Sequence, residues 1–250
     1  MSRTGQGDGA TVCHGEAARR ALEMFGTPQG LDLEAVSDAC DALGLGGFVH
    51  GLIGLWNGAP AIAGPAVTME LVCADYPVAS SHHLGVDAVE AAQAGDVIVI
   101  DHRGRSDAAG WGGLLSQAAK RAGVRGVLVH GGARDVSEAQ AMNLPLWGSS
   151  AVSRTARGRV VQRSVQQPIH FAGVAVRPGD VVFASEGGVV VVPADQLGAV
   201  LTRASDIRRR EGAMQRGVVE GADLRSVLGR RYENMLEQGT DAPEPHDRMS

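Results

Sequence analysis

Residues 109–138 read AGWGGLLSQAAKRAGVRGVLVHGGARDVSE, and this stretch decides the class of fold. Within it, Leu114 to Ala122 is predicted to form a helix that ends at Gly123. Gly126 to His130 follows almost at once as a short and nearly continuous apolar run, typical of a strand buried on both faces. Asp135 to Met142 is again predicted to be helical. Alternating helices and buried strands indicate an α/β core with parallel neighbouring strands.

The same pattern continues on the amino-terminal side of this stretch. We expect a helix over Val86 to Ala94 and then a buried strand over Val97 to Ile100. Asp32 to Leu43 is predicted to be a further helix, because its apolar residues recur at helical spacing and its first residue can cap it. Between these helices, Ala61 to Val72 is expected to form either a pair of strands or one long, bent strand.

The carboxyl-terminal half has a different character. After a short strand expected over Leu144 to Trp147, turn residues separate three β segments that are predicted to be antiparallel: Ile169 to Val176, Asp180 to Ala184 and Val189 to Val192. The chain is expected to be helical again from Asp195, with a terminal helix over Leu224 to Leu236. Residues 1–15 and 240–250 are predicted to be disordered tails, and residues 16–239 to form a single domain.

The composition argues against several classes of protein. A formal charge of -5 over 250 residues argues against a nucleic-acid surface, which would concentrate lysine and arginine. No apolar run approaches the roughly 20 residues of a membrane span, and the first residues do not resemble a signal peptide, so we expect a cytoplasmic protein. The three cysteines are odd in number and form no CxxC pair, so neither a disulfide framework nor a zinc site is predicted. Cys40 and Cys73 are expected to be small apolar fillers.

Two features of the quoted stretch suggest a site for a small acid. Gly112-Gly113 directly precedes an apolar helix, where free backbone N–H groups and the helix dipole favour a carboxylate. Arg134 and Asp135 follow a strand and a glycine turn, the place where α/β folds position ligands. Arg134 offers a permanently charged fork, and Asp135 a hard oxygen ligand for a divalent cation. Cleavage next to a 2-oxo group leaves an enolate, whose charge the cation and Arg134 can stabilise.

Each feature has a simpler interpretation when it is taken alone. A Gly-Gly pair before a helix is common turn chemistry, and an Arg-Asp pair after a strand is often a surface ion pair or a helix cap. The combination at a fixed spacing favours the site.

This combination also resembles the signature of a known family. Gly113, twenty intervening residues, Arg134-Asp135, two more residues and Glu138 are similar to the motif of the RraA-like proteins and the class II HMG/CHA aldolases. That family includes 4-hydroxy-4-methyl-2-oxoglutarate aldolases and oxaloacetate decarboxylases. The resemblance covers most of the chain and implies an α/β fold of the three-layer β/β/α swivelling type, assembled as homotrimers or hexamers with sites at subunit interfaces.

The resemblance also implies roles for individual residues. The substrate carboxylate would be held by the backbone of Gly112, Gly113, Leu114 and Leu115. Arg134 would contact the 2-oxo oxygen, and Asp135 would hold Mg²⁺ or Mn²⁺, partly through water. An acidic residue from a neighbouring subunit would approach the metal, and Glu211 matches it best. Glu138 would either orient Arg134 or cap the following helix.

The chain departs from the family pattern at three positions. His130 stands where relatives commonly have Asp, and Ser185 and Gly187 replace two acidic residues of a common Ala-Asp-x-Asp-Gly run. His130 would act either as a general acid or base or as a strand-end residue that hydrogen-bonds a neighbour. Adjacent His82 and His83 point to opposite faces of an extended segment, so a metal shared between them is not predicted. The run from Arg208 to Arg210 is expected to be a solvated helix face.

Two functions from different classes follow from the sequence. The first is a metal-dependent carbon–carbon lyase that acts on a small-molecule 2-oxo acid, by retro-aldol cleavage, by oxaloacetate decarboxylation or by both. Both reactions pass through the same pyruvate enolate. The alternative is a non-catalytic RraA-like module that binds and regulates a ribonuclease. The extended carboxyl-terminal region that carries Glu211 favours the enzyme.

Overall fold

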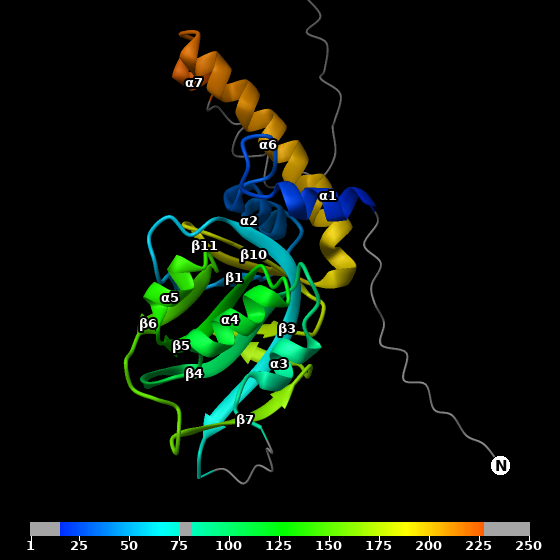
Figure 1. Ribbon diagram of the computed structural model, residues 1–250. Coiled ribbons are helices and arrows are strands. Elements are labelled where there is room, and N and C mark those ends of the chain that lie inside the picture. Colours follow the sequence, from blue (N-terminus) through cyan, green and yellow to red (C-terminus); the bar gives the residue numbers. More distant parts are fainter. Residues whose placement is uncertain (1–15, 76–81, 228–250) are drawn as a thin grey trace, which may run out of the picture.

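A computed structural model describes residues 16–75 and 82–227 of the chain (Figure 1). Both predicted tails, 1–15 and 240–250, lie outside the described residues. Of the predicted terminal helix, α7 covers Leu224–Val227, and the rest also lies outside. Among the helices of the described part, none is both long and apolar enough to cross a membrane.

Four parallel strands form the part of the sheet that carries the candidate site. They are neighbours in the order β3, β4, β5, β6, with the bounds Ile62–Cys73, Val97–Ala109, Gly126–Ala133 and Leu146–Ala151. Their side chains alternate between two cores, because successive residues of a strand point to opposite faces. In β4, Ile98 and Ile100 pack on one side and Val97 and Val99 on the other. The predicted parallel α/β core is confirmed.

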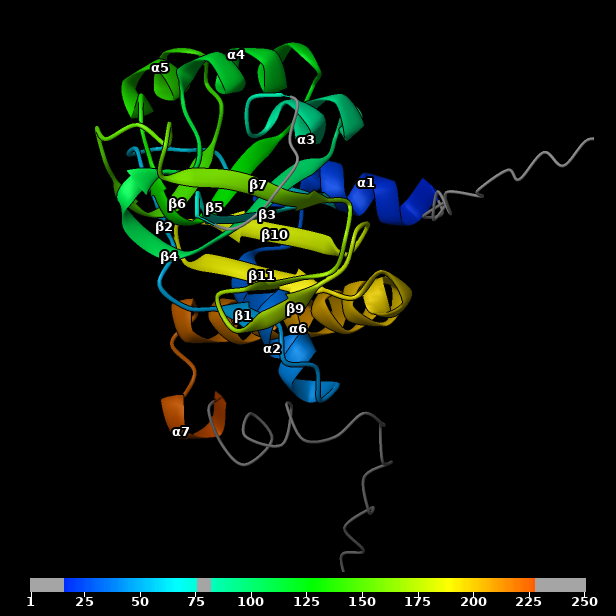
Figure 2. The same ribbon diagram turned by 90° about the horizontal axis from the view of Figure 1, so that it is seen from below.

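Three helices cover one face of these strands (Figure 2). They are α3, Val86–Ala91, α4, Gly113–Arg121, and α5, Val136–Ala141. Each lies between two successive parallel strands in the chain, as connections of this kind require. The predicted helices at 114–122 and 135–142 are confirmed to within about one residue, within the usual uncertainty of helix ends. The predicted helix at 86–94 ends early, at Ala91.

A second, antiparallel group of strands continues from β3, which is one long strand. The first residues of β3 pair with β10, Val181–Ser185, and β10 pairs with β11, Gly188–Val192. The sheet ends with β1, Phe48–Val49. The predicted antiparallel strands are confirmed, except that the segment 169–176 is a hairpin of β8, Ile169–Phe171, and β9, Val174–Val176.

The two strand groups pack against each other, and helices cover both outer faces (Figure 2). The outer face of β10 and β11 packs against α1, Glu16–Met24, α2, Leu33–Ala42, and the long α6, Leu197–Val219, which follows the short η1, Ala194–Gln196. Asp32 caps α2 as predicted, since its Oδ1 accepts the N–H of Ala35 at 2.9 Å. The expected β/β/α layers are therefore present, with a further helical layer on the second strand group.

Several expectations need correction. Three strands were not predicted: β1, β2, Ile53–Gly54, and β7, Val160–Val165. The strand predicted at 144–147 begins only at Leu146. Cys40 is buried as expected, but Cys73 is exposed, and its Sγ accepts a hydrogen bond from Arg105 at 3.2 Å. Arg208 does not lie on a fully solvated face, because its guanidinium pairs with the Asp32 carboxylate.

Candidate active site

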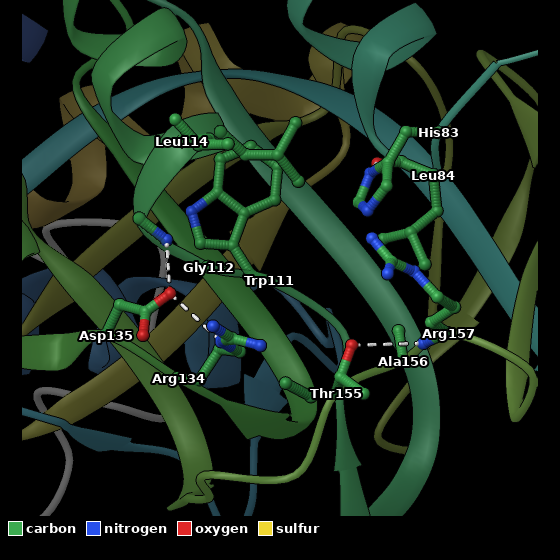
Figure 3. Close-up of a pocket in the computed structure, with 13 residues that line it drawn as sticks. His83, Leu84, Trp111, Gly112, Leu114, Arg134, Asp135, Thr155, Ala156 and Arg157 are labelled. Carbon is green, nitrogen blue, oxygen red and sulfur yellow. Dashed lines mark hydrogen bonds and ion pairs between the residues drawn. The ribbon is translucent and has the colours of Figure 1, made fainter.

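A cavity of about 210 Å³ lies where β5 ends, where α4 begins and where the loop after β6 returns (Figure 3). Because about 10–15 Å³ of such space already holds one water, the cavity has room for a small organic acid. Six of its lining residues were predicted from the sequence: Gly112, Gly113, Leu114, Leu115, Arg134 and Asp135. The first part of the predicted geometry, a helix N-terminus facing an arginine and an aspartate, is therefore present.

Asp135 lies just after the end of β5, and its side chain bonds the start of α4. Its Oδ2 accepts the backbone N–H of Gly113 at 2.9 Å and the Nε–H of Arg134 at 3.0 Å. The backbone of Asp135 is left-handed, with φ 56° and ψ 36°, a region that aspartate and asparagine enter more readily than most residues. This turn directs the carboxylate back toward α4 instead of into solvent.

The two glycines permit this close approach. A Cβ on Gly112 would lie 3.1 Å from Asp135 Oδ2, and a Cβ on Gly113 would lie 2.8 Å from Glu138 Cδ and 3.3 Å from Asp135 Cβ. Gly113 is buried in this contact. A side chain at either position would therefore push the acidic residues away from the helix start.

Trp111 forms the wall behind these residues. Its indole is buried and donates from Nε1 to Ser116 Oγ at 2.9 Å. Its carbonyl accepts the N–H of Arg134 at 3.0 Å. Leu114, on the first turn of α4, is 84% exposed although it lines the cavity, so an apolar side chain stands at the edge of the site.

Arg134 keeps most of its donors available. Of its side-chain donors, only the Nε–H is bonded within the part of the chain that the structure describes, and the bond goes to Asp135. Glu138 lies against Gly113, and among the described residues its carboxylate makes no hydrogen bond to Arg134. Glu138 lies in the first turn of α5 with its carboxylate toward the start of α4, and its role in orienting Arg134 or capping a helix stays a prediction.

Two other predicted residues lie outside the cavity. His130 Nδ1 lies 3.1 Å from Asp101 Oδ1, so this histidine bonds a neighbour, and its role as a general acid or base stays a prediction. Glu211 lies on α6, on the far side of the second strand group. Burial raises the pKa of its carboxyl group, and the nearby charges of Asp38, Asp32 and Glu34 raise it further.

Three residues with polar side chains line the cavity and were not predicted as part of a site. His83 comes from the segment before α3, and Thr155 and Arg157 come from the loop after β6. Because β6 runs parallel to β5, the loops that follow both strands leave the sheet at the same edge. That topology was the signal that could have identified the loop.

The residues that could hold a metal are few. Within residues 16–75 and 82–227, no group of three or more His, Cys, Asp or Glu side chains converges on one point. Asp135 is the acidic residue of the cavity, with Oδ2 engaged and Oδ1 making no hydrogen bond to the described residues. Mg²⁺ commonly keeps several waters and takes one or two carboxylates together with substrate oxygens, so this single carboxylate suits such an ion.

Comparison with known proteins places the chain in a family. The RraA-like family model, described as Aldolase/RraA, matches residues 35–191. Protein DlpA of Legionella pneumophila is 32% identical over 189 residues, 76% of this chain and 30% of DlpA, so the chain spans less than a third of that relative. A Halalkalibacterium halodurans protein with the provisional name 4-hydroxy-4-methyl-2-oxoglutarate aldolase is 32% identical over 158 residues, 63% of this chain and 71% of the relative.

A solved structure agrees with this assignment. The crystal structure of an uncharacterised protein from Pseudomonas syringae pv. tomato is similar with a TM-score of 0.73 and 26% identity, over 84% of this chain and 98% of that one. The family match extends from α2 to β11 and includes every signature residue from Gly113 to Glu138. The chain therefore belongs to the RraA-like family.

Proposed function

We propose that this RraA-like protein is a divalent-metal-dependent carbon–carbon lyase that acts on a 2-oxo acid. One observation carries the proposal: the N-terminus of α4, Arg134 and Asp135 line a single cavity of small-molecule size. The aldolase name of the Halalkalibacterium relative supports the same class of reaction. The non-catalytic alternative gives no reason for an arginine with free donors inside a pocket.

The start of α4 is suited to the substrate carboxylate. The first N–H groups of a helix have no partner within the helix and carry the positive end of its dipole. The N–H of Gly113 is used by Asp135, so the N–H groups of Leu114 and Leu115 are the ones left for a ligand. Arg134, anchored through Nε, can direct its terminal nitrogens to the 2-oxo oxygen.

Asp135 is the residue that would hold Mg²⁺ or Mn²⁺, through its Oδ1 and in part through water. The cation, when bound, supplies a Lewis acid next to the 2-oxo group. The bond from Asp135 Oδ2 to Gly113 fixes the orientation of the carboxylate before any ligand arrives, which lowers the cost of ordering the site on binding.

Retro-aldol cleavage and decarboxylation make the same demand on the protein. Both break a carbon–carbon bond next to the 2-oxo acid unit and leave an enolate whose negative charge grows on the 2-oxo oxygen. Arg134 is permanently charged and already oriented, so it stabilises that charge without reorganising. The residues of the cavity are equally suited to both reactions.

We further propose that the enzyme works as a homotrimer or hexamer. Glu211 lies on α6 beside the acidic side chains of α2 and does not line the cavity of its own chain. It can therefore reach a metal near Asp135 only from a neighbouring subunit, at an interface between copies of the chain.

The test is a coupled assay on the purified protein. Oxaloacetate and Mg²⁺ are added, pyruvate is followed with lactate dehydrogenase, and the slow metal-catalysed background is subtracted. We expect Arg134→Ala and Asp135→Ala each to lower kcat/KM by about 100-fold or more, as expected for charged groups that act on the transition state. Arg121→Ala and Asp195→Ala, exposed positions away from the cavity, serve as matched controls and should keep wild-type activity.

Two outcomes would contradict the proposal. Pyruvate release that persists in Arg134→Ala would place the chemistry elsewhere. No metal-dependent release from oxaloacetate and from a series of 4-hydroxy-2-oxo acids would favour the protein-binding alternative instead.

A further inference from the structure

Both proposed reactions need a group that moves a proton, and the signature residues of the cavity are poorly suited to that task. Arg134 is permanently charged. Asp135 accepts two hydrogen bonds through Oδ2, and its Oδ1 is the proposed ligand of the cation. Of the other side chains that line the cavity in the described part of the chain, only His83 is of a type that exchanges protons near neutral pH.

His83 lies across the cavity from these signature residues. It belongs to the segment that leads into α3, and Figure 3 shows it on the side away from Asp135. The cavity is small, at about 210 Å³. A ligand with its carboxylate at the start of α4 and its 2-oxo oxygen at Arg134 therefore extends its remaining carbon atoms toward His83. Those atoms include C3, where the bond breaks and where the proton must arrive.

The backbone of this segment is anchored, although the His83 side chain is exposed. Leu84 is buried in the core under the helices. The N–H of Gly85 donates to Oε1 of the buried Gln162 at 2.8 Å. A Cβ on Gly85 would lie 2.8 Å from the Leu115 side chain, so the segment packs directly against the cavity wall. The imidazole therefore starts from a defined position at the edge of the cavity.

One hydrogen bond determines which ring nitrogen of His83 is available. Nδ1 lies 2.8 Å from the carbonyl oxygen of Leu84. Since a carbonyl only accepts, Nδ1 carries the hydrogen, and the lone pair of the neutral ring is on Nε2. Among the described residues, Nε2 has no hydrogen-bond partner. The ring is thus held in the tautomer of a base whose lone pair is free for a ligand.

The charged groups near this imidazole come from several elements. Arg157, on the loop between β6 and β7, lines the same cavity, as do Arg134 and Asp135, which pair with each other. On the imidazole's own segment, His82 Nδ1 lies 3.5 Å from Asp87 Oδ1 of α3. No carboxylate of the described residues bonds to the imidazole itself, so its proton can pass to a ligand instead of staying in an ion pair.

We propose that His83 is a catalytic residue that moves the proton of both reactions through Nε2. In retro-aldol cleavage, Nε2 takes the proton of the 4-hydroxyl group, the electron pair of that O–H bond forms the new carbonyl group, and the C3–C4 pair forms the enolate. Nε2 then returns the proton to C3, which gives pyruvate. In decarboxylation, carbon dioxide leaves, and C3 takes a proton that Nε2 has received from solvent. This inference rests on the proposed function, because it takes the substrate carboxylate to lie at α4.

Hydrogen exchange at the methyl group of pyruvate tests this role without the full substrate. A base that removes a methyl proton forms the same enolate, and the enolate takes a deuteron when the solvent is D₂O. Proton NMR with Mg²⁺ present follows the loss of the methyl signal, and the background without protein is subtracted. Titration calorimetry gives the dissociation constant of pyruvate for the same samples. The variants are His83→Gln and, as the matched control, His82→Gln, since His82 is exposed and does not line the cavity.

We expect His83→Gln to slow the exchange by about 100-fold or more, the usual contribution of a general acid or base. Its dissociation constant for pyruvate should stay within about twofold of the wild-type value. Wild-type exchange should slow as the pH falls below neutral, because a protonated Nε2 cannot accept the methyl proton. This pH dependence should be absent from the residual exchange of His83→Gln. His82→Gln should behave as the wild type in both measurements.

The results distinguish failure of this inference from failure of the proposed function. Exchange at the wild-type rate in His83→Gln would overturn the role of His83 and leave the 2-oxo acid site standing. Loss of pyruvate binding together with exchange would also overturn it, because His83 would then hold the ligand instead of moving its proton. So would a wild type that binds pyruvate without exchanging it. If the wild type does not bind pyruvate, the proposed 2-oxo acid site itself is wrong, and the inference fails with it.

Discussion

At the scale of single residues, Gly113 meets two requirements that other residues cannot meet together. Its N–H donates to the Asp135 carboxylate, and its missing side chain leaves room for Glu138 against the start of α4. The nearest obstacle to a Cβ is the end of the Glu138 side chain, which can move, whereas Asp135 Cβ at 3.3 Å is less free. A methyl group here would disturb the site more than the fold.

We therefore predict that Gly113→Ala lowers kcat/KM by about tenfold or more and changes the free energy of unfolding by about 1 kcal/mol or less. Steady-state kinetics and urea denaturation measure the two effects. If the clash with Glu138 is the cause, Gly113→Ala should cost less activity in a Glu138→Ala background than in the wild type. An equal cost in both backgrounds would rule out that cause.

His102 is a second residue with a measurable consequence. It is buried, and burial lowers the pKa of its imidazole below the ordinary value of 6.5. The hydrogen bond to the Ala108 carbonyl opposes the shift. Of the nearby charges, Arg105 lowers the pKa further, whereas Asp107 and Asp101 raise it. In the folded protein this group therefore stays neutral at a pH where the unfolded chain is already protonated.

The sign of the effect on stability follows from this difference in proton uptake. As the pH falls below 6.5, the unfolded state binds a proton that the folded state does not, so the free energy of unfolding falls. His102→Gln keeps a donor for the Ala108 carbonyl and removes the titration. Between about pH 7 and pH 5, its free energy of unfolding should fall less steeply than that of the wild type. Equal slopes in urea denaturation would contradict the prediction.

At the scale of secondary-structure elements, α2 and α6 are joined through Asp32. This side chain caps α2 through Oδ1 and pairs with Arg208 of α6 through Oδ2. The cap satisfies an N–H group that the helix cannot satisfy by itself. The side chains of Arg208 and Asp32 are 35% and 37% exposed, so solvent weakens the ion pair between them.

Asp32→Ala should accordingly cost more stability than Arg208→Ala. Loss of the cap costs about 1 kcal/mol, and loss of a partly exposed ion pair between 0 and about 1 kcal/mol. Urea denaturation of both single variants and of the double variant gives the coupling energy. A coupling energy well above about 1 kcal/mol would show that the pair is more important than its exposure suggests.

The elements differ in how far the sequence predicts them, and the reason is physical. The helices and the central parallel strands follow from local patterns, such as the run Val97 to Ile100 or the apolar spacing of α2. The strands β1, β2 and β7 lack such patterns. Each forms by pairing with a strand that is distant in the sequence, so no local pattern is required. The candidate site divides in the same way. Arg134 and Asp135 follow from a motif, whereas Arg157 depends on where a loop folds back.

At the scale of the whole molecule, the proposed assembly predicts complementation between two inactive variants. If each site needs Asp135 of one chain and Glu211 of a neighbour, then Asp135→Asn and Glu211→Gln should each be nearly inactive alone. In an equal mixture that has exchanged subunits, about one site in four combines both intact residues, so about a quarter of wild-type activity should return. Light scattering of the wild type should show a trimer or hexamer.

As the control, the activity of the mixture is measured before and after subunit exchange. Before exchange the two variants should stay inactive. Full loss of activity in Asp135→Asn together with wild-type activity in Glu211→Gln would remove Glu211 from the site. Exchange without any recovery would show that both residues act within one chain.

The long strand β3 connects the two strand groups along a single stretch of backbone. It pairs antiparallel with β10 from Ile62 to Pro65 and parallel with β4 from Ala66 to Glu70. Neither group can separate from the other without breaking this strand's own hydrogen bonds. The two groups should therefore melt in one cooperative transition, and the amide protons at the centre of β3 should exchange with deuterium only when the entire domain unfolds.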